Sequence, residues 1–346
     1  MEIADIVQYL KDYDGRPITL MEICGSHTAA IAKYGIRDIL SDKIRLISGP
    51  GCPVCVTPSS YIDRLIELAK MPGTTVASFG DMLRVPGSRI SLSEAKSEGA
   101  NTVMVYSPAD LLKLAENNPD RQYVFAAVGF ETTAPVYTLL LDEIIAGKIS
   151  NISLLTSIKT MPAAVNWIMD KGAAIDGFIA PGHVCAITGA DYFRECAEKY
   201  RIPFSVAGFD DMELILAIYG LVRMIERGEY TVKNYYPSIV EAGSNSIAMD
   251  KLYQYFEPVS AMWRGMGEIA GSGLVLRPEY SKYDRGSADL KENVSRNKGC
   301  SCGRILMGQI EPEECPLFGR VCSPENPQGA CMVSYEGACY QKYING

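Results

Sequence analysis

Thiol, imidazole and carboxyl groups are concentrated in four short segments of this chain, and each segment follows a run of apolar residues. Both histidines, and four of the five cysteines that precede Cys300, fall in these segments. The segments are Cys24-Gly-Ser-His-Thr28, Gly49-Pro-Gly-Cys-Pro-Val-Cys55, Gly129-Phe-Glu-Thr-Thr-Ala-Pro135 and Pro181-Gly-His-Val-Cys-Ala-Ile-Thr-Gly189. Because the carboxyl ends of parallel strands open on one crevice, we expect the four segments to form a single site.

In the first segment, Cys24 lies three residues before His27 in a glycine turn. A thiolate is a soft ligand for low-valent iron or zinc, and a neighbouring imidazole can lower the thiol pKa or relay a proton. A small buried side chain followed by a helix-capping Ser26 or Thr28 explains the same residues. The presence of the other three segments favours a functional site.

The second segment holds Cys52 and Cys55 as a CxxC pair. Such a pair binds a metal when it is reduced and closes a reversible disulfide when it is oxidised. Pro53 rigidifies the loop and removes one backbone donor. Since the chain has no second CxxC to complete a zinc site, we expect redox chemistry here, with unreactive loop thiols as the alternative.

Glu131 and His183 are the polar residues near the start of the third and fourth segments. Glu131 would place a carboxylate at the sheet edge while a following threonine caps the next helix; proton transfer or ligand binding by Glu131 stays open. His183 suits an ordinary loop histidine, but its place among the strand-end segments favours a role in the site. Cys185 has no clear role, and Cys196 falls in a helical pattern that suits a core residue.

Six cysteines and no histidine lie in the last part of the chain, which is rich in Gly and Pro. This composition favours a 4Fe–4S cluster, with an all-cysteine zinc site as the alternative. The spacing differs from zinc ribbons and ferredoxins, and its C-x-C resembles the clusters of thiol reductases. We choose four ligands partly on the family resemblance given below. The expected ligands are Cys302, Cys315, Cys322 and Cys339, and the alternates are Cys300 and Cys331.

Composition argues against several classes of function. The chain has 346 residues, of which 47% are hydrophobic, and a formal net charge of −8, which argues against nucleic-acid and anionic-membrane binding. No apolar run reaches the roughly 20 residues of a membrane span. The N-terminus lacks the pattern of a signal peptide, so we expect a cytoplasmic protein, in which eleven cysteines suit metal or thiol chemistry. The motifs of radical-SAM and P-loop proteins do not occur.

Short β-branched runs alternate with helical patterns up to residue 228, which predicts βαβ units and parallel sheets. One large sheet is possible, but the length suits two small parallel-sheet α/β domains, at residues 1–118 and 119–230. Beyond them we expect a helical, cysteine-rich iron–sulfur domain at 231–346, in which residues 265–273 form a turn-rich connector. The expected strands are 18–23, 44–48, 75–79, 102–106, 123–128, 152–157, 177–180 and 204–208.

Five motifs, taken together, resemble the HypD family of hydrogenase maturation factors. They are CGSHT, GPGCPVC, GFETTAP, PGHV with its following TG, and the tail CxCGRIL…CPLFGRVCSPENP…CMVSYEGAC, in this order over about residues 20–343. The resemblance implies a monomeric three-domain protein that works with HypC as the scaffold for the Fe(CN)2CO group of NiFe hydrogenase. HypE would donate the cyanide, and the iron unit would then pass to the hydrogenase large-subunit precursor.

The same resemblance implies roles for individual residues. Cys24 would be the iron ligand shared with HypC, with His27 beside it. The Cys52–Cys55 pair would exchange electrons with the 4Fe–4S cluster. Glu131 and His183 would line the central cleft. Cys185 is a departure, because we expect serine there in most relatives.

Two other functions fit the same residues. A stand-alone iron–sulfur disulfide reductase would use the tail cluster to reduce the Cys52–Cys55 pair and turn over a disulfide substrate. A binding module stabilised by zinc would hold the metal in the tail and need no redox chemistry.

Overall fold

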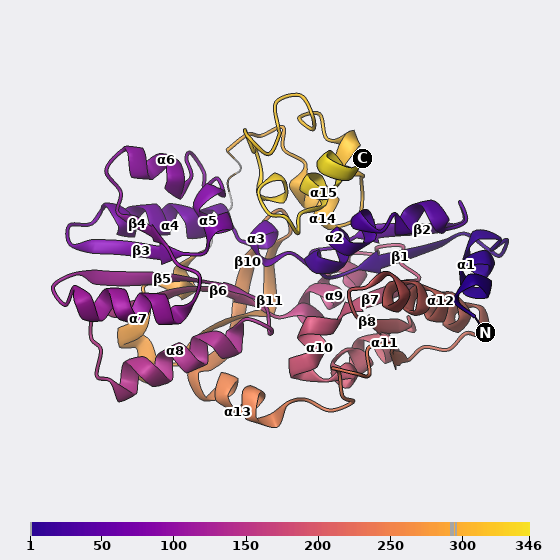
Figure 1. The fold of residues 1–346 in the computed structure, drawn as a ribbon, viewed down its shortest axis with the longest axis horizontal. Helices are drawn as coiled ribbons and strands as arrows, with labels where there is room; N and C mark the ends of the chain where they lie inside the picture. The colour runs from indigo at the N-terminus through magenta and orange to yellow at the C-terminus, as the bar shows by residue number, and fades with distance from the viewer. Residues whose placement is uncertain (1, 291–293, 295) are drawn as a thin grey trace.

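Two β-sheets form the framework of the molecule in the computed structural model, which describes residues 2–290, 294 and 296–346 (Figure 1). The strands are β1 (Ile18–Glu22), β2 (Ile44–Ser48), β3 (Thr74–Ser78), β4 (Thr102–Met104), β5 (Gln122–Gly129), β6 (Ile152–Lys159), β7 (Gly177–Pro181), β8 (Phe204–Ala207), β9 (Val232–Asn234), β10 (Phe256–Trp263) and β11 (Gly267–Leu276). One sheet has the order β2-β1-β7-β8-β9 and is parallel throughout. The other has the order β10-β11-β6-β5-β3-β4; the pairs that β11 makes are antiparallel and the others parallel. The predicted α/β class is confirmed, and all eight expected strands are present.

Helices connect the strands and cover the sheets on both faces. In Figure 1, α4 lies on one side of the six-stranded sheet, and α7 and α8 lie on the other. The helices are α1 (Ile3–Lys11), α2 (Gly25–Lys33), α3 (Pro53–Val56), α4 (Ser59–Lys70), α5 (Gly80–Arg84), α6 (Leu92–Ser97), α7 (Pro108–Asn117), α8 (Ala134–Ala146), α9 (Met161–Asp170), α10 (Gly182–Thr188), α11 (Arg194–Tyr200), α12 (Asp211–Arg227), α13 (Ser246–Tyr255), α14 (Cys302–Leu306) and α15 (Ala338–Asn345). The 3-10 helices are η1 (Ile36–Ile39), η2 (Ala190–Phe193), η3 (Pro278–Tyr283), η4 (Ser287–Asp289), η5 (Pro312–Glu314) and η6 (Ala330–Met332). Among the described residues, no helix is both long and apolar enough to cross a membrane.

The two sheets are interleaved along the chain. Strands β1 and β2 lie beside β7, whereas β3 to β6 form the second sheet together with β10 and β11. The boundary expected near residue 118 therefore does not separate the sheets, because β5 pairs with β3 across it. The residues that suggested the boundary form a turn, in which the Arg121 N–H donates to the Asn118 carbonyl at 3.1 Å.

Residues 265–273 are not a connector, because they form the turn and much of the second strand of an antiparallel hairpin. Gly265 and Gly267 have φ values of +77° and +90°, which favour glycine at this turn. Strand β11 also pairs with β6 in an antiparallel manner, with Gly273 opposite Lys159. The region expected to be helical thus adds two strands to the second sheet.

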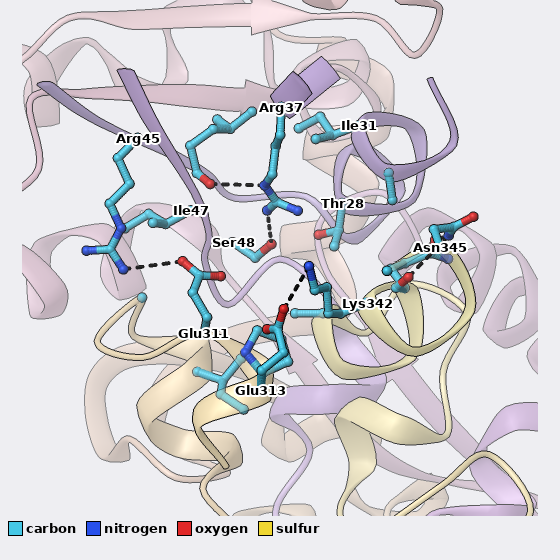
Figure 2. Close-up of a pocket in the computed structure, with 18 of the residues that line it drawn as sticks. Thr28, Ile31, Arg37, Arg45, Ile47, Ser48, Glu311, Glu313, Lys342 and Asn345 are labelled. Atoms are coloured by element: carbon cyan, nitrogen blue, oxygen red, sulfur yellow. Dashed lines mark hydrogen bonds and ion pairs between the residues drawn. The ribbon is translucent and has the colours of Figure 1, made fainter. Parts of the chain in front are cut away.

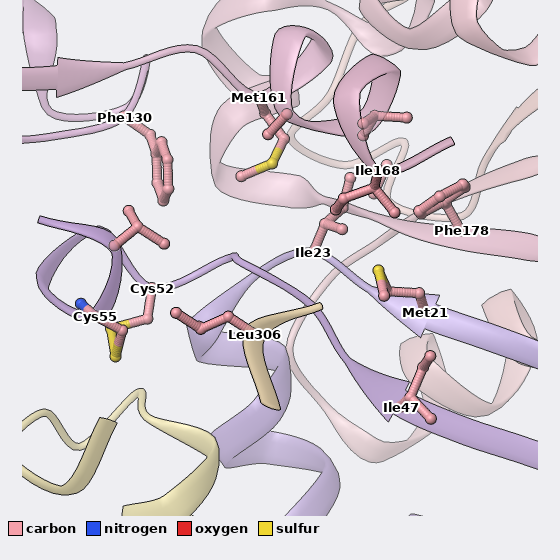
Figure 3. Packing of buried hydrophobic residues seen from close by; sticks show 14 of the residues in the cluster. Met21, Ile23, Ile47, Cys52, Cys55, Phe130, Met161, Ile168, Phe178 and Leu306 are labelled. Carbon is pink, nitrogen blue, oxygen red and sulfur yellow. A yellow bond between two sulfur atoms is a disulfide. The ribbon is translucent and has the colours of Figure 1, made fainter. Parts of the chain in front are cut away.

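Buried side chains from both sheets and from the tail meet in one cluster. In Figure 3, Met21 and Ile23 come from β1 and its end, Phe130 follows β5, Cys52 precedes α3, and Leu306 belongs to α14. The tail, yellow in Figure 1, packs α15 against α2 and η6 against α3. The strand-end loops and the cysteine-rich tail are consequently held against each other.

Candidate functional site

The CGSHT and GPGCPVC loops contact each other through their backbones. The Gly25 N–H donates to the Gly51 carbonyl at 3.0 Å, and the Gly49 N–H donates to the Glu22 carbonyl at 2.8 Å. A Cβ atom on Gly51 would collide with the backbone of Cys24, which no side-chain movement could relieve. Glycine is therefore required at Gly51 for the two cysteine-bearing loops to approach.

Cys24 is buried at the N-terminus of α2 and is itself the N-cap residue, the position for which Ser26 and Thr28 were considered. Its N–H donates to Glu22 Oε2 at 3.0 Å, and the Thr28 hydroxyl donates to the other oxygen of the same carboxyl group. The pKa of the Cys24 thiol is raised to about 12, chiefly by burial and also by the nearby carboxyl groups of Glu336 and Glu22. The backbone N–H groups of His27 and Ser26 oppose this rise. A metal cation would provide the positive charge that a buried thiolate needs.

Both histidine rings pack on Phe209, which lies in the loop between β8 and α12. The His27 ring centroid lies 4.8 Å from that of Phe209, and the His183 ring stacks on it at 3.9 Å. His27 Nε2 lies 2.9 Å from the Gly208 carbonyl oxygen, so Nε2 carries the proton. Burial lowers the pKa of His27 to about 4, and its Nδ1 has no hydrogen-bond partner within the described ranges. His27 thus presents one bare acceptor atom, whereas His183 is exposed and contacts this group of residues through its stacking on Phe209.

Glu131 is buried just after the end of β5, and only one of its two carboxyl oxygens is hydrogen-bonded. Its Oε1 accepts from the Met161 N–H and the Tyr192 hydroxyl, both at 2.8 Å. Its Oε2 is buried without a partner among the described atoms, and burial raises the pKa of this carboxyl to about 7. Thr133 is the N-cap residue of α8, but its side chain makes no capping hydrogen bond.

Cys185 is a buried thiol near two of these groups, Glu131 and Cys24. Burial raises its pKa, and the charges of Glu131 and Cys24 raise it further, so the thiol lies within electrostatic range of both. Cys196 is buried in the hydrophobic cluster, as expected for a core residue.

Cys52 and Cys55 form a disulfide at the start of α3. The Cys55 N–H donates to Cys52 Sγ at 3.1 Å, and the two residues are 3% and 0% exposed. Because α3 packs against η6, the disulfide lies beside the part of the tail that carries Cys331.

The tail cysteines approach one another closely. Cys302 Sγ lies 3.2 Å from Cys300 Sγ, and Cys331 and Cys339 are close enough to Cys302 to influence the pKa of its thiol. The pKa of Cys300 is lowered to about 6, chiefly by its hydrogen bond with Cys302, and the positive charge of Arg264 acts in the same direction. A Cβ on Gly329 would collide with both sulfurs of this first pair.

These thiols fit an iron–sulfur cluster as a donor set. The contacting group contains both alternates, Cys300 and Cys331, while Cys315 and Cys322 lie in the same buried cluster, so the choice of four ligands stays a prediction. Within the described ranges, no three Cys, His, Asp or Glu side chains are placed to hold a metal ion together.

A separate groove of about 360 Å³ lies between the tail and residues of α2, η1 and β2 (Figure 2). Arg45 pairs with Glu311 at 3.3 Å, and Lys342 pairs with Glu313 at 2.7 Å. The first ion pair joins the tail to β2, and the second joins η5 to α15 within the tail. They lie away from the sulfur atoms described above and were not foreseen from the sequence.

Several residues of the site also escaped the sequence analysis. Glu22 is a carboxyl group within an apolar strand, a signal that could have been noticed. Phe209, Tyr192, Arg264 and Glu336 carry no local signal, because their roles arise from contacts with distant segments.

Comparison with known proteins gives a consistent result over nearly the whole chain. The HypD family model, described as "Hydrogenase formation hypA family", matches residues 2–346. The chain is 42% identical over 342 residues to a protein of Azotobacter vinelandii named hydrogenase maturation factor HypD, covering 96% of this chain and 90% of that one. Proteins of the same name from Rhizobium leguminosarum bv. viciae and Rhodobacter capsulatus are 42% and 39% identical, covering 100% and 98% of this chain and 92% of each relative.

Proposed function

Because the chain belongs to the HypD family of hydrogenase formation proteins, we propose that it acts in hydrogenase maturation, as the scaffold on which iron acquires cyanide and carbonyl ligands. The observation that carries this proposal is the environment of Cys24. A buried thiol at a helix N-terminus, with His27, Cys185 and Glu22 around it, offers a soft ligand to low-spin iron.

In the proposed reaction, Cys24 binds the iron substrate as a thiolate and gives up its proton. The raised thiol pKa makes this deprotonation depend on the metal, so iron and not solvent determines the charge of Cys24. When the Glu131 carboxyl is protonated, its unpartnered Oε2 can donate a hydrogen bond to a cyanide ligand on the bound iron, whereas the bare His27 Nδ1 can only accept one. HypC would share the iron with Cys24, HypE would supply cyanide, and the hydrogenase large-subunit precursor would receive the iron unit, all in the cytoplasm.

The tail thiols would hold a 4Fe–4S cluster, which supplies single electrons when it is bound. The Cys52–Cys55 disulfide takes up two electrons and two protons when a low-potential donor reduces it to two thiols. Because both residues are almost fully buried, a large external disulfide substrate cannot reach the bond. This burial argues against the stand-alone disulfide reductase.

Infrared spectroscopy tests the proposal directly. The chain is co-expressed with HypC and HypE, the HypC complex is purified anaerobically, and cyanide and carbonyl stretching bands are recorded. We expect the bands in the wild-type complex, their loss in Cys24→Ala, and their retention in Cys196→Ala, which removes a buried thiol outside the site. A wild-type complex without these bands would refute the scaffold. Bands that persist in Cys24→Ala would refute the ligand assignment alone.

A further inference from the structure

Arg264 is a buried cation at the turn between β10 and β11, with 5% of its surface exposed. It has no ion-pair partner within the part of the chain that the structure describes. Burial lowers the pKa of this guanidinium group, while Cys302, Cys331 and Cys300, followed by Asp63, act in the opposite direction, so Arg264 lies within electrostatic range of the tail cysteines. A guanidinium group keeps its charge even when buried, whereas a lysine amine readily loses it. A permanent positive charge therefore faces the tail thiols.

Three hydrogen bonds fix this side chain and its backbone, two of them to residues that follow the disulfide and one to Pro86. Arg264 Nε donates to the Thr57 carbonyl at 2.7 Å, and Nη2 donates to the Pro86 carbonyl at 3.0 Å. The Arg264 N–H donates to the Val56 carbonyl at 2.8 Å. The guanidinium is thus held at the end of α3, two residues after Cys55.

The same turn also touches the tail at Cys302. A Cβ on Gly303 would lie 2.6 Å from the Gly265 carbonyl oxygen and 2.7 Å from its Cα, so the two glycine backbones are in close contact. Gly303 directly follows Cys302 at the start of α14. The turn that carries Arg264 therefore contacts both the disulfide helix and the residue that follows Cys302.

We propose that Arg264 is a positioning residue that raises the reduction potential of the metal centre bound by the tail cysteines. The inference rests on the iron–sulfur centre of the proposed function. Adding one electron makes such a centre more negative by one charge and breaks no bond. A fixed cation nearby stabilises the reduced form more than the oxidised form, and in a buried setting water screens this effect little.

A redox titration of the anaerobically purified full-length protein tests this role, with electron paramagnetic resonance as the readout and iron and sulfide content as a check of cluster loading. Arg264→Met keeps the length and removes the charge. We expect at least a tenfold fall in the ratio of reduced to oxidised centre at a fixed potential, which for one electron is a shift of about 59 mV to more negative values. The reduction potential of the Arg264→Lys protein should shift less than that of Arg264→Met. Arg285→Met, which changes a half-buried arginine bonded to Ser153, should leave the potential unchanged.

Asp63→Asn provides a second variant that leaves Arg264 intact. It removes the opposing carboxylate charge, while the amide oxygen can still accept from the Ser88 N–H, so the potential should move to more positive values. Unchanged potentials in a fully loaded Arg264→Met protein would overturn the inference. If Arg264→Met does not bind iron, an unchanged or negative shift in Asp63→Asn would overturn it instead. A wild-type protein without an iron–sulfur signal would overturn both this inference and the proposed cofactor, whereas the infrared test of Cys24 stands independently.

Discussion

Replacing Lys159 with methionine should remove a pH dependence of stability that this side chain creates. Lys159 is 3% exposed at the end of β6, where Nζ donates to the Met262 carbonyl at 2.8 Å and lies 5.4 Å from the centre of the Trp263 ring. A small cavity of about 60 Å³ adjoins it. Burial lowers the pKa of Lys159 from 10.5 to about 7, and no carboxylate opposes this change among the described residues.

The sign of the effect follows from proton binding. In the unfolded chain the amine keeps its ordinary pKa, so between about pH 7 and pH 10 the unfolded state binds more protons and stability rises with pH. Each pH unit in this window is worth about 1.4 kcal/mol, so from about pH 7 to pH 9 the wild type should gain about 2 kcal/mol relative to Lys159→Met. Below about pH 6 residue Lys159 is protonated in both the folded and the unfolded state, so the plots of unfolding free energy against pH for the wild type and Lys159→Met should run parallel.

Urea denaturation of both proteins across this pH range measures the difference, because other titrating groups are common to the two. Methionine nearly preserves the buried volume, so the variant should remain folded. Lys251→Met serves as the control, since Lys251 is partly exposed and paired with Asp142 at 2.7 Å. Parallel curves for wild type and Lys159→Met between about pH 7 and pH 9 would refute the conclusion that this amine is buried as a neutral group.

Three further changes test other parts of the structure. Gly51→Ala should lower the free energy of unfolding by about 1–3 kcal/mol because its Cβ meets the Cys24 backbone, while Gly243→Ala, with open space around it, should change little in the same urea experiment. The pKa of Glu131 is raised in the folded state, so its contribution to the free energy of unfolding is present at low pH and is lost as the pH rises through about 7. The wild type should therefore lose about 2.5 kcal/mol of stability between about pH 5 and pH 8, and Glu131→Gln should not show this loss. Equal losses in both proteins would contradict this prediction. Glu311→Gln breaks an exposed ion pair and should change the thermal midpoint only slightly, corresponding to less than about 1 kcal/mol.

The sequence supported the strands and the convergence of their ends because both depend on local pattern. β-Branched runs predicted β1 through β8, and parallel strands necessarily place Cys24, Gly51 and His183 at one sheet edge. The thiol chemistry could likewise be proposed from residue types alone. These inferences needed no knowledge of which strand pairs with which.

The sequence could not predict which strands pair with each other, and the reason is physical. β1 pairs with β7 through Leu20 and Gly177, and this choice depends on side chains packing across both faces of the sheet, which no local pattern reports. The β10–β11 hairpin was missed because glycines at Gly271 and Gly273 interrupt the alternation of β11. Arg264 acquires its role through segments far from it in the sequence.

Interleaved sheets constrain how the chain can fold as it leaves the ribosome. When β6 has been synthesised, β1 and β2 still lack β7, and β6 still lacks β11. Strand edges with unpaired N–H and C=O groups therefore persist in the nascent chain, and such edges are where misassociation begins. Neither sheet is formed by one continuous segment of the chain, so truncation before Leu276 leaves the second sheet incomplete. A chaperone that covers open strand edges would act on the nascent chain before β7 and β11 have been synthesised.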